Sequence, residues 1–119
     1  MQPLGIHHVS INVQDTAAAI EFYTEVLGFT QRDDRPDFRF AGAWLDVAGQ
    51  QVHLIEMPGP EDRGQHYAIG VADLDAAVRE IRARGIEISE PKPVGGGRQA
   101  FLRDPSGNLV ELNEPTRSQ

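Results

Sequence analysis

The stretch GIHHVSINVQDTAAA, residues 5–19, returns 58 residues later as RGQHYAIGVADLDAA, residues 63–77. Both copies alternate apolar and polar residues, as a strand does, and then present Asp followed by alanines, as a helix start does. Two copies of one supersecondary unit explain such an offset. The superposed identical residues are His8/His66, Ile11/Ile69, Val13/Val71, Asp15/Asp73, Ala18/Ala76 and Ala19/Ala77.

The same offset continues toward the C-terminal end of each copy. It places His53 on Glu111, and it superposes Asp46/Asp104, Gly49/Gly107, Val52/Val110, Leu54/Leu112 and Glu56/Glu114, with a one-residue slip at the loop where Gly28 meets Gly85. A chain of 119 residues is the size of one compact domain. The sequence therefore predicts a single domain over 1–119 that is built from two similar halves.

Each half is expected to fold as β-α-β-β-β, which makes the chain α+β. The pattern predicts strands at 5–13 and 66–72 and helices at 16–27 and 74–84, capped by Asp15 or Thr16 and by Asp73 and ended by Gly28 and Gly85. Short strands are expected at 29–32, 38–47, 51–57, 86–89, 99–103 and 108–114. The first repeat then covers about 4–57, a connector rich in Pro, Gly and charge covers 58–65, and the second repeat covers about 66–114.

Composition excludes several classes of function. Eighteen acidic residues against eleven basic ones give a formal charge of −7, which disfavours nucleic acid and anionic membranes as partners. No apolar run approaches the roughly 20 residues of a membrane span, and the N-terminus lacks the pattern of a secretory signal. Because Cys is absent, disulfides and thiolate zinc sites are excluded. A cytoplasmic protein is the expectation.

Four residues of metal-ligating types stand at the matched positions of the repeat: His8, His53, His66 and Glu111. Within each copy the two candidates are 45 residues apart, so a pseudo-twofold relation would preserve the geometry of each pair. Imidazole and carboxylate together suit a borderline divalent ion, namely Zn²⁺, Ni²⁺, Co²⁺, Mn²⁺ or Fe²⁺. We expect one such ion per site.

Four motifs resemble the vicinal oxygen chelate superfamily, which includes glyoxalase I, bleomycin- and fosfomycin-resistance proteins, epimerases and extradiol dioxygenases. They are HHVSINV followed by Asp15, EFYxxVLGF at 21–29, VHLIE at 52–56 and DPxGNxVEL at 104–112. The resemblance implies two tandem βαβββ modules that form curled mixed sheets around a metal site. His8, His53, His66 and Glu111 fall on the family's ligand positions.

The resemblance implies a metal-dependent lyase or isomerase that acts on a small substrate with vicinal oxygens, similar to lactoylglutathione lyase. Glu111 matches the family's catalytic glutamate, which both ligates the metal and moves a proton between adjacent carbons. Two positions depart from bacterial glyoxalase I, since His53 replaces a Glu and Asn12 replaces the Arg that binds glutathione. The resemblance therefore leaves open which thiol, if any, takes part in the reaction.

Other activities of the same fold remain alternatives. One is an antibiotic-resistance protein that only binds its drug, although binding proteins of this kind commonly lack the metal ligands. Others are a fosfomycin-type thiol transferase and an epimerase or extradiol-type dioxygenase. Single-pair members of the family are commonly homodimers that share their sites, so a homodimer is expected here.

Several further residues are expected around the substrate or outside the site. Ser10 and Asn12 share a strand face with His8, and Asn113 is predicted beside Glu111. The residues predicted to bind substrate are Ser10, Asn12, Trp44, Arg98, Phe101 and Asn113. His7 is expected on the opposite face from His8, Glu56 and Glu114 are expected to be solvated charges, and Gly95–Gly97 to form a flexible loop at the mouth of the site.

Overall fold

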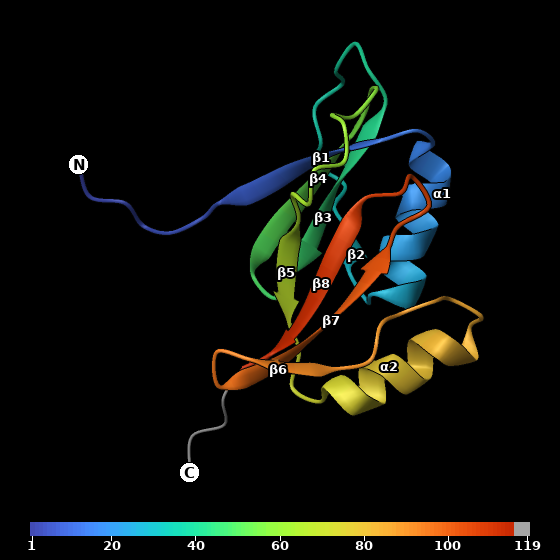
Figure 1. The fold of residues 1–119 in the computed structure, drawn as a ribbon. Helices are drawn as coiled ribbons and strands as arrows, with labels where there is room; N and C mark the ends of the chain where they lie inside the picture. The colour runs from blue at the N-terminus through green and yellow to red at the C-terminus, as the bar shows by residue number, and fades with distance from the viewer. Residues whose placement is uncertain (116–119) are drawn as a thin grey trace. The chain divides into compact units, whose positions relative to one another are not determined.

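The computed structural model describes residues 1–115, and these divide into two compact units, Met1–Glu61 and Asp62 onward. Each unit is a βαβββ module with one four-stranded mixed sheet (Figure 1). The predicted α+β class of two tandem βαβββ modules is therefore confirmed. None of the helices within 1–115 is long and apolar enough to cross a membrane.

The first unit has the strand order β1-β4-β3-β2, with β1 and β4 parallel and the other pairs antiparallel. The helical segment of this unit packs on one face of the sheet, against β3 and β4. Its elements are β1 (His8–Val13), α1 (Thr16–Glu21), the π-helical turn η1 (Phe22–Val26), β2 (Thr30–Gln31), β3 (Gly42–Val47) and β4 (Gln50–Glu56).

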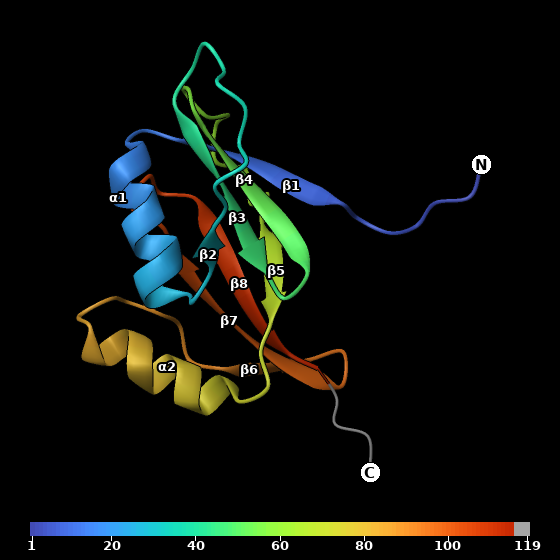
Figure 2. The same ribbon diagram turned by 180° about the vertical axis from the view of Figure 1, so that it is seen from behind.

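The second unit repeats this order as β5-β8-β7-β6, again with the first two strands parallel. Its helix α2 (Leu74–Ala83) packs against β7 and β8, as seen from behind in Figure 2. The strands of this unit are β5 (Tyr67–Gly70), β6 (Lys92–Val94), β7 (Gly97–Arg103) and β8 (Leu109–Glu114).

Apolar side chains of alternate strand positions form the helix-facing core of each sheet. In the first unit Val52, Leu54 and Leu45 are almost fully buried, and in the second Val110 and Leu112 are. Because strand side chains alternate between faces, His53 and Glu111 point to the face of their sheet opposite to this core. The fold thus leaves one face of each sheet for polar residues.

Two carboxylates anchor the helix starts. The prediction that both are solvated charges is wrong for Glu114, whose side chain is only 13% exposed, whereas Glu56 is exposed but also hydrogen-bonded. Glu56 Oε1 accepts hydrogen bonds from Thr16 N (2.9 Å) and Thr16 Oγ1 (3.0 Å). At the matched position Glu114 Oε2 accepts from Leu74 N (2.8 Å). The first N–H groups of a helix have no partner within the helix and favour negative charge, so the last strand of each module fixes the start of its own helix. The predicted caps Asp15 and Asp73 also accept from the backbone three residues on.

The edge of the second sheet departs from the prediction of a strand at 86–89. Only Ile88 forms a bridge there, with Leu102, and the edge strand is instead β6, further along the chain. Gly95 and Gly96 both have positive φ, 59° and 85°, in the two-residue turn between β6 and β7. Tight hairpins favour this conformation. The expected flexible loop at 95–97 is therefore a β-hairpin.

Candidate metal centre

The polar face of the first sheet presents a row of side chains across three neighbouring strands. Ser10 on β1 and Trp44 on β3 are both direct register partners of His53 on β4. His8 lies two residues before Ser10 and therefore on the same face. The sheet register thus brings His8 beside His53, although they are far apart in sequence.

Aromatic rings enclose the imidazole of His53. It stacks on His8 with ring centroids 4.0 Å apart and planes at 16°, and on Trp44 with centroids 4.3 Å apart and planes at 9°. His53 is only 8% exposed. Burial, followed by the nearby charge of His8, holds the pKa of His53 below its usual value, so the imidazole favours the neutral form that a metal ligand requires.

Neighbouring groups occupy one ring nitrogen of each histidine in this pair. His53 Nε2 lies 2.8 Å from Gln51 Oε1. Because that oxygen is an acceptor, Nε2 donates and Nδ1 keeps its lone pair. His7 Nδ1 lies 2.9 Å from His8 Nδ1, which leaves Nε2 of His8 without this contact. His7 precedes the first residue of β1.

The second unit pairs His66 with Glu111. Their side chains, 32% and 10% exposed, approach to 3.0 Å between His66 Nε2 and Glu111 Oε1. His66 Nδ1 donates to the Gly64 carbonyl oxygen at 2.8 Å, and Asn113 Nδ2 donates to Glu111 Oε2 at 3.0 Å. The hydrogen bond to Gly64, aided by Glu111, raises the pKa of His66. Both side chains are thus held by a second partner, as the outer contacts of metal ligands commonly are.

The four predicted ligands therefore form two pairs, His8 with His53 and His66 with Glu111. Within residues 1–115, no group of three or more His, Asp or Glu side chains is placed to hold an ion. The donor chemistry nevertheless fits a borderline divalent ion, because each pair supplies imidazole or carboxylate donors whose other polar atoms are engaged.

Trp44 and Phe101 are equivalent residues of the two modules, because each is the register partner of the second ligand of its pair. Phe101 packs edge-on against His66, with ring centroids 5.3 Å apart. Both rings are partly exposed. Both rings lie beside the candidate ligands, and their contact with a substrate stays a prediction.

The remaining predicted substrate residues have different surroundings. Ser10 is exposed on the ligand face of β1, and Asn12 is partly exposed on the same face. Arg98 donates to Asp75 (3.0 Å) and Glu114 (3.3 Å) beside the start of α2, and the Asp75 bond raises its pKa. A substrate would have to compete with these carboxylates for Arg98.

Sequence reasoning missed the groups that orient the ligands. Gly64 acts through a backbone carbonyl, which carries no residue-specific signal. Gln51 stands two residues before His53, so strand alternation could have placed both on one face. The Asn113 contact with Glu111 follows from the same spacing, but its direction, from the amide to the carboxylate, required the structure.

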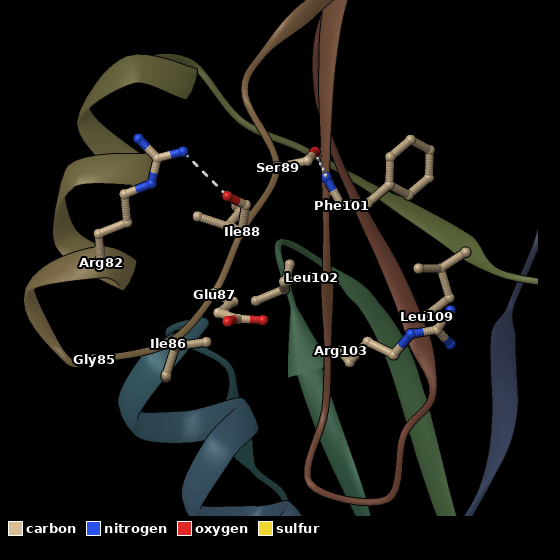
Figure 3. Close-up of a pocket in the computed structure, with 10 residues that line it drawn as sticks. All are labelled: Arg82, Gly85, Ile86, Glu87, Ile88, Ser89, Phe101, Leu102, Arg103 and Leu109. Atoms are coloured by element: carbon tan, nitrogen blue, oxygen red, sulfur yellow. Dashed lines mark hydrogen bonds between the residues drawn. The ribbon is translucent and has the colours of Figure 1, made fainter.

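The second unit also has a hollow, which shares Phe101 with the surroundings of His66. Figure 3 shows it between the end of α2 and β7, with Arg82 on one side of the strand and the Phe101 ring on the other. Arg82 donates to the Ile88 carbonyl oxygen and to Glu90. The hollow contains none of the four predicted ligands, so we do not assign the reaction to it.

Comparison with known proteins identifies one superfamily. A model of the Glyoxalase/Bleomycin resistance protein/Dioxygenase superfamily matches residues 5–112. The chain is 35% identical over 121 residues to a "Probable lactoylglutathione lyase" of Vibrio cholerae, a match that covers 90% of this chain and 88% of that protein.

Two solved structures have the same fold with different named roles. TnmS3, an antibiotic binding protein from Streptomyces sp. CB03234, has a TM-score of 0.80 and 27% identity, over 98% of this chain and 99% of that one. A fosfomycin resistance protein from Listeria monocytogenes, complexed with Mn(II), has a TM-score of 0.81 and 21% identity, over 97% and 95%.

Proposed function

Because the chain belongs to the Glyoxalase/Bleomycin resistance protein/Dioxygenase superfamily, we propose that it is a divalent-metal-dependent lyase or isomerase. Its substrate is a small molecule with vicinal oxygens, such as the hemithioacetal of a 2-oxoaldehyde and a thiol. The observation that carries the proposal is the 3.0 Å approach of His66 Nε2 to Glu111 Oε1. A carboxylate suited to proton transfer there adjoins a nitrogen suited to metal binding.

We propose His8, His53, His66 and Glu111 as the ligands of one ion. When bound, a divalent ion polarises the two adjacent substrate oxygens and so acidifies the neighbouring C–H bond. Assembling four ligands requires both pairs, from one chain or from two copies. We propose a homodimer, which light scattering after size exclusion tests directly.

In this scheme Glu111 is the base. Its Oε1 takes the proton from one substrate carbon and returns it to the adjacent carbon. Asn113 holds Oε2 at 3.0 Å, so the carboxylate keeps one oxygen fixed while the other moves the proton. The Gly64 carbonyl keeps the hydrogen of neutral His66 on Nδ1, which leaves the lone pair of Nε2 for the ion.

The test is metal content by mass spectrometry on tag-free protein, comparing wild type with His66→Ala and Glu111→Gln. Wild type is expected to hold Zn²⁺, Ni²⁺ or Co²⁺ stoichiometrically and both variants to lose it. Glu80→Gln is the matched control, since it makes the same change as Glu111→Gln at an exposed position of α2. Each loaded sample is then assayed with methylglyoxal plus glutathione or other thiols, and a metal-free wild type would overturn the proposal.

A binding protein without turnover is the second candidate. The observation that favours it is the set of aromatic rings around His53, which could hold a ligand without chemistry. Metal retention with no turnover on any thiol adduct would favour this candidate over the lyase.

A further inference from the structure

The loop before β3 places an aromatic wall next to the His8–His53 pair. Phe38 and Phe40 stack with ring centroids 5.2 Å apart and planes at 7°. Phe38 lies 6.2 Å from Trp44, which itself stacks on His53. We call Phe38, Phe40 and Trp44 the aromatic wall, and it extends the imidazole pair into a continuous series of rings within the first unit.

This wall is not part of the hydrophobic core. Phe38 is 40% exposed, and Phe40 and Trp44 are partly exposed. The core of the unit uses other rings, because Phe22 and Tyr23 of η1 and the nearby Phe29 are buried in contact with one another. Exposed rings cost free energy in water, so their concentration beside a candidate site indicates a binding surface.

An arginine without a carboxylate partner completes the surface. The guanidinium carbon of Arg35 lies 4.8 Å from the Phe38 centroid and 5.5 Å from the Phe40 centroid. Arg35 donates one hydrogen bond, to the Phe40 carbonyl oxygen at 2.9 Å, and forms no ion pair in the described part of the chain. By contrast, Arg32 and Arg98 each bind two carboxylates.

The guanidinium keeps donors available, since arginine carries five N–H groups and fits carboxylates in a fork geometry. Its place beside the aromatic wall matches a ligand that combines an apolar planar body with an anionic group.

We propose that the substrate of this site is an aromatic compound with an anionic substituent. Its planar body packs against Phe38 and Trp44, and its carboxylate or equivalent anion pairs with Arg35. The inference rests on the proposed function, because it assigns the part of the substrate that extends beyond the vicinal oxygens at the proposed metal site.

The test uses 2-naphthoate as the probe and decahydro-2-naphthoate as its matched control, which has the same charge and carbon skeleton without aromatic faces. The chain has a single Trp, so the indole N–H of Trp44 gives one assigned signal in a ¹H–¹⁵N spectrum. Both compounds are titrated into the full chain, once loaded with Zn²⁺ and once treated with EDTA.

We expect 2-naphthoate to shift the Trp44 signal and to bind about three- to tenfold more tightly than the saturated control, as aromatic contacts contribute. Phe38→Leu should remove that preference, and Arg35→Gln should weaken the binding of both compounds several-fold. Arg79→Gln, an exposed arginine of α2, should leave binding unchanged. Phe38 and Arg35 lie in a loop with exposed side-chain surface, so these variants are expected to fold.

Equal affinity for the two compounds, or binding that is unchanged in both Phe38→Leu and Arg35→Gln, would overturn the inference. Failure of the proposed function has a different signature, namely absence of metal from wild type. A protein that binds metal and turns over a methylglyoxal adduct but shows no preference for 2-naphthoate refutes the substrate class alone. A metal-free protein that keeps the Phe38-dependent preference and the Arg35-dependent affinity refutes the lyase and leaves the aromatic anion as a bound ligand.

Discussion

Removal of the carboxylate that anchors α2 should destabilise the protein more than removal of its equivalent at α1. Glu114 has a side chain only 13% exposed, accepts a hydrogen bond from Leu74 N at 2.8 Å and also pairs with Arg98. Glu56 makes similar contacts with Thr16 but is exposed. Because solvent replaces an exposed partner at little cost, the two matched positions should differ in magnitude.

The magnitude follows from these contacts. A hydrogen bond to a charged group contributes about 1.5–3 kcal/mol, and negative charge at a helix start about 0.3–1 kcal/mol. Since Arg98 keeps Asp75 as a partner, we expect Glu114→Ala to lower the free energy of unfolding by about 2–3 kcal/mol. We expect about 1 kcal/mol for Glu56→Ala.

Urea unfolding of EDTA-treated protein, followed by circular dichroism, measures both changes. With a typical dependence of about 1–3 kcal/mol per molar urea, Glu114→Ala should lower the midpoint by roughly 1 M or more. Glu80→Ala, at an exposed position within α2, is the control and should stay within about 0.5 kcal/mol of wild type. Equal losses of unfolding free energy in Glu114→Ala and Glu56→Ala would show that burial of the carboxylate does not determine how much it stabilises the protein.

Four further predictions concern pH, packing and the ligand shell. Burial lowers the pKa of His53. The unfolded chain therefore binds more protons than the folded chain, and the free energy of unfolding falls as the pH drops through the ordinary histidine range. His53→Gln should reduce that loss in metal-free urea titrations. The pKa of His66 is raised, so its effect on stability has the opposite pH dependence. The stabilisation is present at low pH and is lost as the pH rises through the pKa of the folded state. His66→Gln should abolish it in the same titrations. Gly42→Ala should lower the free energy of unfolding by about 1–3 kcal/mol, because its Cβ would meet the Leu54 carbonyl oxygen; a neutral result in urea would contradict this close approach. Asn113→Ala should weaken Zn²⁺ binding about 10- to 100-fold by calorimetry while the unfolding midpoint changes little, and unchanged affinity would remove Asn113 from the ligand shell.

Much of the fold could be predicted because its determinants are local or repeated. The strand alternation around His8 and His66 and the caps Asp15 and Asp73 depend on neighbouring residues, and the 58-residue offset relates the two modules without any knowledge of their contacts. The offset also matched His53 with Glu111. The sequence alone thus determined the βαβββ repeat and nominated one pair of candidate ligands in each module.

Other features depend on contacts between segments that are distant in sequence. The hydrogen bonds of Glu56 and Glu114 to the helix starts span 40 residues, so the sequence pattern showed only two polar residues near strand ends. Ile88 lies where the repeat predicts a strand, but the hairpin of β6 with β7 supplies the sheet edge instead. Competition between such pairings is decided by the whole sheet.

The chemical detail of the candidate site was likewise decided by tertiary structure. Sequence identified His53 and Trp44, but only the register of β3 and β4 made them stacked neighbours. The tautomer of His66 depends on a backbone carbonyl at Gly64, and the cation beside Phe38 depends on how its loop folds. Sequence determines which chemical groups are available and where periodic structure begins, whereas the environment of each group is set by segments that meet only in the folded chain.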